Sequence, residues 1–234
     1  MPAMPKARRL DQLLSSLGHG SRREVRDLID CGLVTVHGDV IHDEGTKIAP
    51  GDVAAILVAG EPLEAPEGVL AMLHKPLDCT CTHAEDEGTT IYKLLPERWT
   101  KRNPPVTSIG RLDKDTTGLI LVTDQGELVQ RWTSPKSVVE KVYEVTVDKP
   151  LEEHLVSLFA SGVVILRGEN EPCLPARLEI VDDHFARLTL TEGRYHQVRR
   201  MFASQGWHVE KLHRTRFGEH VLGNLPEGSW RMIE

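Results

Sequence analysis

Hydrophobic residues recur at helical spacing in the first part of the chain. Four leucines lie three or four residues apart, at Leu10, Leu13, Leu14 and Leu17. This spacing predicts a short amphipathic helix that ends before Gly18. Ser21 and Glu24 then have the spacing of a capping box, in which each side chain binds the backbone of the other residue. A second helix is therefore expected up to Gly32, followed by a hairpin over residues 34–41.

The hydrophobic pattern stops at residues 59–68. This segment holds two prolines, two glycines and three glutamates and has no apolar period. Such a composition is typical of an extended, acidic linker. We therefore predict a small N-terminal domain over residues 7–58, a linker over residues 59–68 and a larger domain over residues 69–234.

The larger domain alternates short apolar runs with polar turns. Strands are expected in five places, at residues 69–73, 119–122, 142–147, 178–181 and 186–190. Helical spacing returns at residues 151–160 and 197–205, and Gly206 is a suitable C-terminal stop for the second of these helices. Strands and helices mixed in this order predict an α+β fold.

Composition indicates the general class of protein but does not indicate a reaction. The chain has 234 residues, 40% of them hydrophobic, and a mean hydropathy of -0.28, which is typical of a soluble globular protein. No apolar run reaches membrane-spanning length, and the first residues lack the apolar core of a signal peptide, so a cytoplasmic protein without a membrane partner is expected.

The four cysteines are too few for a disulfide framework and fit a reduced compartment. Cys79 and Cys81 lie between His74 and His83, but their spacing is not that of a structural zinc site. Two thiols on one face of an extended segment are expected instead, and no metal.

A net charge of -7 argues against a nucleic-acid partner only if charge is spread evenly. Residues 193–218 contain six lysines and arginines and one acid, Glu210, which gives a local charge of +5. Attraction to phosphate is local, because salt screens charges over about 10 Å. The stretch indicates either an ordinary solvated basic face or an RNA-binding one.

One segment carries an obvious chemical group. Residues 110–119 read GRLDKDTTGL, so that Asp113 lies between two cations, Arg111 and Lys114, and just before a turn cluster. A carboxylate in such a turn suits a nucleophile or a base in a cleft. From this segment alone, Asp113 and Asp115 serve equally well as caps of a turn.

Residues 110–119 closely resemble the catalytic signature of pseudouridine synthases, in the RsuA-type branch that acts on small-subunit ribosomal RNA. Two further blocks are similar to the same family: SPK at 134–136 with EKVY at 140–143, and EGRYHQVRRMF at 192–202. The run SRREVR at 21–26 and the segment GLVTVHGDV at 32–40 resemble an S4 RNA-binding domain. The sequence departs from the family at residues 74–77, where HKPL replaces the more usual Asn-Lys-Pro-x-Gly.

The resemblance implies a small N-terminal S4-like RNA-binding domain, followed by a synthase domain with a central, mainly antiparallel sheet, flanking helices and a cleft across the sheet. It implies that Asp113 is the catalytic nucleophile or base and that Arg199 is its ionic partner. Tyr143 is expected to stack on the target base, although the residue pattern alone makes it an ordinary core residue. Arg111 is expected to fill the space left by a flipped-out nucleotide, or to be a local counter-ion.

The remaining predicted contacts are to RNA. Arg22, Arg23 and Arg26 share one face of the second helix, and the resemblance implies that they meet phosphates; from spacing alone they are solvent-facing residues that balance nearby acids. Arg194 and Arg200 are further candidates for phosphate contact.

The predicted function is the isomerisation of a flipped-out uridine to pseudouridine in 16S rRNA, with uridine 516 as the family's usual target. The reaction consumes no redox equivalent or group, so no cofactor is expected. The partner is ribosomal RNA or a small-subunit assembly intermediate, and a monomer is expected. A synthase acting on 23S rRNA, a non-catalytic RNA-binding assembly factor and a nucleoside hydrolase are the alternatives.

Overall fold

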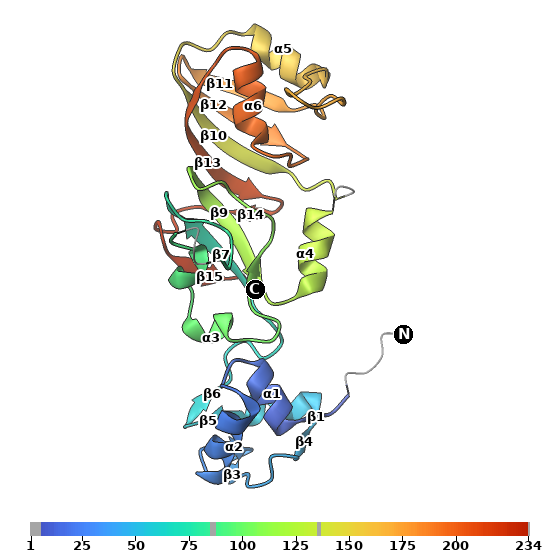
Figure 1. Ribbon diagram of the computed structural model, residues 1–234, viewed down its shortest axis with the longest axis vertical. Helices are drawn as coiled ribbons and strands as arrows, with labels where there is room; N and C mark the ends of the chain where they lie inside the picture. Colours follow the sequence, from blue (N-terminus) through green and yellow to red (C-terminus); the bar gives the residue numbers. More distant parts are fainter. Residues whose placement is uncertain (1–5, 85–87, 135–136, 234) are drawn as a thin grey trace. The chain divides into compact units, whose positions relative to one another are not determined.

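The computed structural model describes residues 6–84, 88–134 and 137–233, which divide into two compact units (Figure 1). The first unit contains the chain up to Leu70 together with Leu95–Thr107 and Val122–Gly126. The second unit contains Ala71–Leu94, Ser108–Leu121 and the chain from Glu127 onward. Among the described residues, no helix has the length and apolar character needed to cross a bilayer.

The first unit packs two helices against small sheets. Its elements are β1 (Arg8–Arg9), α1 (Leu10–Ser16), α2 (Arg22–Asp30), β2 (Val34–Val36), β3 (Asp39–Val40), β4 (Lys47–Ile48), a 3-10 helix η1 (Pro50–Ala55), β5 (Ile56–Val58), β6 (Glu61–Pro62) and α3 (Glu97–Thr100). Strands β3, β2, β5 and β6 form one sheet, and β1 pairs with β4. The buried leucines of α1, with Val25 and Ile29 of α2, form the core of this unit.

The capping box of α2 is present as predicted. The Ser21 hydroxyl accepts a hydrogen bond from the Glu24 backbone at 3.3 Å, and the Glu24 carboxylate accepts one from the Ser21 backbone at 2.7 Å. Both helices and the hairpin expected in this part of the chain are confirmed.

The prediction of an extended linker over residues 59–68 is wrong for part of that segment. Residues Glu61–Pro62 form β6 and pair with β5, and Leu63 is buried in the core of the first unit. The Glu64 carboxylate accepts a hydrogen bond from the indole of Trp99 at 2.9 Å. Composition could not show this, because the partner that orders the segment lies 35 residues away in the sequence.

The second unit is built on one large sheet. Within the described residues this sheet has nine strands, in the order β11-β12-β10-β13-β9-β7-β15, with β14 beside β13 and β8 beside β9. The strands are β7 (Leu70–Lys75), β8 (Thr107–Ser108), β9 (Thr116–Thr123), β10 (Lys141–Val147), β11 (Arg177–Asp182), β12 (Phe185–Leu190), β13 (Val209–Phe217), β14 (His220–Val221) and β15 (Trp230–Met232). Most neighbours are antiparallel, while β13 and β9 are parallel. The predicted α+β fold with a mainly antiparallel sheet is confirmed.

Helices lie beside this sheet in Figure 1: α4 (Gly126–Thr133), α5 (His154–Ser161) and α6 (Gln197–Ser204). A short 3-10 helix, η3, spans Ile91–Leu94. Leu155 and Phe159 of α5 and Phe202 of α6 are buried, and the rings of Phe159 and Phe202 pack edge to face at 5.3 Å. The helices expected at 151–160 and 197–205 are therefore present, whereas α4 and β13 were not expected.

Candidate active site

A large cleft lies within the second unit, with a volume of about 1790 Å³. Its walls come from the loop 109–116, from β10 and β13, from the start of α6 and from the loop 168–174. Residues that are far apart in the sequence therefore meet around one cavity. The cleft includes Asp113 and Tyr143 among its lining residues.

Asp113 is carried by a turn that leads into β9. The Thr116 backbone donates a hydrogen bond to the Asp113 carbonyl at 3.0 Å, which closes the turn. The Asp113 side chain is 34% exposed, and its Oδ1 lies 3.2 Å from Nε2 of His196. The carboxylate is thus open to the cleft and has an imidazole as its neighbour.

The side chain of Lys75 supports the backbone of the same turn. This side chain is fully buried, and Nζ donates hydrogen bonds to the carbonyls of Thr116 at 2.7 Å and Pro76 at 2.9 Å. Burial lowers the pKa of Lys75. The motif HKPL, noted for its departure from the family, therefore places a cation where it fixes the backbone of the Asp113 turn.

The predicted ion pair between Arg199 and Asp113 is wrong. Arg199 Nη2 lies 2.9 Å from the Asp115 carboxylate and also donates to the Asp115 carbonyl at 3.0 Å, while Nη1 donates to the carbonyl of Val209 at 2.6 Å. Asp113 and Asp115 are two residues apart in one loop, and only their positions in space decide which one the guanidinium reaches. Arg199 therefore ties α6 and β13 to the loop that carries Asp113.

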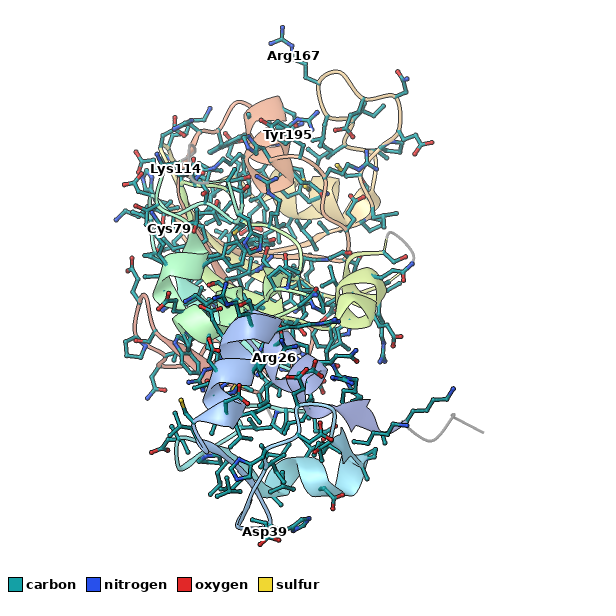
Figure 2. All side chains as sticks on the ribbon, turned by 60° about the horizontal axis from the view of Figure 1, so that its bottom comes forward. Arg26, Asp39, Cys79, Lys114, Arg167 and Tyr195 are labelled. Atoms are coloured by element: carbon teal, nitrogen blue, oxygen red, sulfur yellow. The ribbon has the colours of Figure 1, made fainter. Side chains whose placement is uncertain are left out.

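His196 and Tyr195 were missed as site residues. His196 is the N-cap of α6 and has a left-handed backbone (φ 48). The Tyr195 ring stacks on the His196 ring at 3.9 Å between centroids, and Tyr195 is 75% exposed. Figure 2 labels Tyr195 at the start of α6. The sequence held no periodic signal for this arrangement, because it depends on one unusual backbone conformation.

Tyr143 lies on β10 and faces the cleft with only 9% of its surface exposed. The guanidinium carbon of Arg214 lies 6.0 Å from the centre of its ring. Leu212, from the same strand as Arg214, also lines the cleft. The ring is thus both a core residue and part of the cleft wall.

The predicted RNA-binding arginines have different environments. Arg111 is exposed and lines the cleft, and Arg22 and Arg23 are exposed on α2. Arg26 forms a two-pronged ion pair with Glu44. Arg194 and Arg200 both pair with Glu169, at 2.7 Å and 2.6 Å. Whether these residues contact RNA stays a prediction.

The basic stretch 193–218 does not form one face. Arg194 and Arg200 hold the loop that contains Glu169, Arg199 pairs with Asp115, and Arg214 is buried. In the same loop Arg167 points outward at the edge of the unit (Figure 2). Most cations of the stretch therefore have internal partners.

Cys79 and Cys81 are free and buried, and burial raises the pKa of each thiol. Among the residues that the structure describes, no cluster of three or more His, Cys, Asp or Glu side chains could hold a metal ion. Of the predicted block 134–136, Ser134 lines the cleft, while Pro135 and Lys136 lie outside the described residues.

Comparison with known proteins agrees with this architecture. Residues 69–204 match the model of the family described as RNA pseudouridylate synthase, and residues 8–53 match the S4 domain. Ribosomal small subunit pseudouridine synthase A of Haemophilus influenzae is 40% identical, over 96% of this chain and 95% of its own length. The enzyme of the same name from Pseudomonas aeruginosa is 38% identical, over 96% of both chains. A crystal structure of a pseudouridylate synthase has 40% identity, covers 97% of this chain and 96% of its own, and gives a TM-score of 0.67.

The mainly antiparallel sheet with its cleft and the N-terminal S4 domain define the class as an RNA-modifying enzyme. Within that class, the chain belongs to the RNA pseudouridylate synthase family. The prediction of a pseudouridine synthase made from residues 110–119 is thereby confirmed.

Proposed function

We propose that this enzyme converts one uridine of 16S rRNA to pseudouridine, with Asp113 as the reacting carboxylate. The observation that carries the proposal is the position of Asp113, whose side chain is 34% exposed in a cleft of about 1790 Å³ that Tyr143 also lines. The choice of small-subunit RNA is supported by the names of the relatives, which match this chain over nearly its whole length. Uridine 516 is the proposed position.

The reaction breaks the bond between N1 of uracil and C1' of ribose, turns the base and joins C5 to C1'. The C5 hydrogen leaves as a proton and N1 gains a proton, so the product is an isomer and no electrons are gained or lost. A side chain is enough for this chemistry, and we propose that it proceeds without a cofactor. An ionised carboxylate serves as a nucleophile towards the nucleoside or as a base towards a ribose proton.

The other residues have supporting roles in this proposal. The uridine leaves its RNA stack to enter the cleft, at a cost of a few kcal/mol. Tyr143 stacks on the uracil, and Arg111 at the cleft wall takes the vacated space. Arg199 positions the Asp113 loop through Asp115.

The direct test is a single-nucleotide map of pseudouridine in rRNA from cells with and without the gene, followed by reaction of the purified protein with unmodified 16S rRNA or its assembly intermediates. We expect one 16S position to lose its pseudouridine, and the protein to restore it without added nucleotide or metal. A missing position in 23S rRNA would assign the large-subunit substrate instead. Release of free uracil would assign a hydrolase.

Asp113→Asn is expected to lower turnover by a factor of about 10²–10⁴ or more, because the neutral amide neither attacks carbon nor accepts a proton. RNA affinity is expected to stay within about threefold, because phosphate contacts dominate it. Asp183→Asn, at an exposed aspartate in the turn between β11 and β12, is the matched control. Full turnover by Asp113→Asn would show that Asp113 is not the reacting carboxylate, whereas a non-catalytic assembly factor would show no turnover in either protein.

A further inference from the structure

Two cations face the cleft from neighbouring strands, Lys141 of β10 and Arg214 of β13. Lys141 lies opposite Phe217 and Tyr143 lies opposite Arg214, with a register shift between these pairs at Thr215. Side chains alternate along a regular strand, so Arg214 and Phe217, three residues apart, would point to opposite faces. The extra residue of the bulge turns both towards the cleft.

Arg214 is buried without a compensating charge. Only 2% of the residue is exposed, and Nε donates a hydrogen bond to the carbonyl of Leu119 at 2.8 Å. Nη2 is also buried, and it has no hydrogen-bond partner among the described residues. No described carboxylate forms an ion pair with the guanidinium group.

Lys141, on the neighbouring strand, is partly buried. Its Nζ donates to the carbonyl of Val139 at 3.0 Å, and no described carboxylate pairs with it. Burial lowers the pKa of Lys141, and the positive charge of Arg214 lowers it further, while Glu192 acts in the opposite direction. Glu192 is occupied by Arg194 at 3.1 Å and by Gln197 at 2.6 Å.

Contacts with aromatic rings offset only part of the free-energy cost of burying these unpaired cations. The guanidinium carbon of Arg214 lies 5.2 Å from the centre of the Phe217 ring, and Nζ of Lys141 lies 5.6 Å from the same centre. Attraction to a ring face is weaker than the penalty for removing an unpaired cation from water. Two such cations on one cavity wall therefore indicate a binding site for an anion.

We propose that Lys141 and Arg214 bind the phosphodiester of the uridine that is being modified. This inference rests on the proposed function, because only a nucleotide that enters the cleft brings a phosphate beside Tyr143. The planar guanidinium suits two phosphate oxygens, and its buried Nη2 has no hydrogen-bond partner among the described residues. The site thereby couples entry of a nucleotide to neutralisation of a charge that no described carboxylate balances.

The test removes the negative charge from the RNA. Substrate RNA is made with a single neutral methylphosphonate linkage on the 5' side of the target uridine, on its 3' side, or several nucleotides away as a control. We expect one of the two adjacent linkages to lower kcat/KM of the wild-type protein by about tenfold to a hundredfold, as for loss of a charge-assisted hydrogen bond. The distant linkage should change it little.

Variants test whether the phosphate contact is made by Lys141 and Arg214. In Lys141→Gln the same neutral linkage is expected to cost less than about threefold, because its partner has already been removed. Arg214→Lys keeps the charge but loses the planar fork, so its sensitivity should fall between the two. Lys211→Gln, at an exposed cation of β13 outside the cleft, should stay as sensitive as the wild type.

Equal rates of the wild-type protein on charged and neutral linkages would overturn the phosphate site and leave the proposed function intact. The same conclusion would follow if Lys141→Gln and Arg214→Lys were both as sensitive as the wild type. Failure of the wild-type protein to convert the unmodified RNA would instead refute the proposed function, and the site with it.

Discussion

Two carboxylates in the Asp113 loop have different partners from the start of α6. Asp115 pairs with the guanidinium group of Arg199 at 2.9 Å, whereas Oδ1 of Asp113 lies 3.2 Å from an imidazole nitrogen of His196. The same guanidinium group also donates to the Asp115 carbonyl at 3.0 Å, so Asp115 has a structural role in the loop. Asp113 has the longer contact, and its carboxylate lines the cleft.

His19 is a titratable residue with a consequence for stability. It follows α1, and its Nε2 is buried without a hydrogen-bond partner among the described residues. Burial, and then the charges of Arg98 and Arg102, lower the pKa of His19 to about 4. As the pH falls from about 6.5 towards 4, the unfolded chain binds a proton that the folded chain does not, so the free energy of unfolding decreases.

We therefore expect the thermal midpoint of the wild-type protein to fall more steeply between pH 7 and pH 4 than that of His19→Gln, which does not titrate. Thermal unfolding followed by circular dichroism at a series of pH values measures this difference. Parallel pH curves for the two proteins would contradict the lowered pKa of His19.

Local patterns in the sequence predicted some elements and could not predict others. The capping box at Ser21 and the alternation in β10 depend on residues that are close in the chain, so both were expected. Strand β13 was hidden because its buried residues are spaced irregularly, and the two register shifts, at Glu210 and Thr215, are the reason. Asp113 and Tyr143 were found in the cleft by resemblance, whereas the partner of Arg199 depends on three-dimensional distances that no motif encodes.

Gly118 allows β9 and β13 to approach each other next to Arg214. Its backbone has a φ of +107, and an added Cβ would lie 2.3 Å from the carbonyl oxygen of Arg214. Gly118→Ala is therefore expected to lower the free energy of unfolding by about 3 kcal/mol or more, through strain and a backbone clash. Gly126→Ala, where φ is not positive and no atom lies within 4 Å, should change it by less than about 1 kcal/mol.

Denaturant unfolding of both glycine variants checks this prediction. Similar midpoints for Gly118→Ala and the wild type would show that the two strands can separate at no cost. In that case the close approach would not be what places Arg214.

The first unit is assembled from three separate stretches of chain. The guanidinium of Arg102 is buried and pairs with Asp124 at 2.7 Å, and Asp124 also accepts a hydrogen bond from the Val69 backbone at 2.8 Å. A buried pair of this kind is costly to break, since either partner alone would be an uncompensated charge. Arg102 and Asp124 belong to two segments of the first unit that lie between segments of the second unit in the sequence. A single domain boundary along the sequence could not predict this contact.

Because the net charge is -7, we expect RNA affinity to depend on a few exposed cations. Arg22 and Arg23 are exposed in the first turn of α2. Replacing both with alanine is expected to weaken RNA binding and to reduce the slope of log affinity against log salt by about 1.4 to 1.8, since each lost phosphate contact removes about 0.7 to 0.9. The rate of the bound complex should not change, because neither residue belongs to the cleft.

Affinity measured at several salt concentrations, together with single-turnover rates, tests whether these arginines contribute to RNA binding and not to the chemical step. Arg177→Ala combined with Arg187→Ala removes the same charge from β11 and β12 and should leave the slope within about 0.5 of the wild-type value. If both double variants lowered the slope equally, the attraction would come from the total charge rather than from the start of α2. A slower single turnover in the Arg22 and Arg23 variant would instead show that the S4 domain contributes to the chemical step as well as to docking.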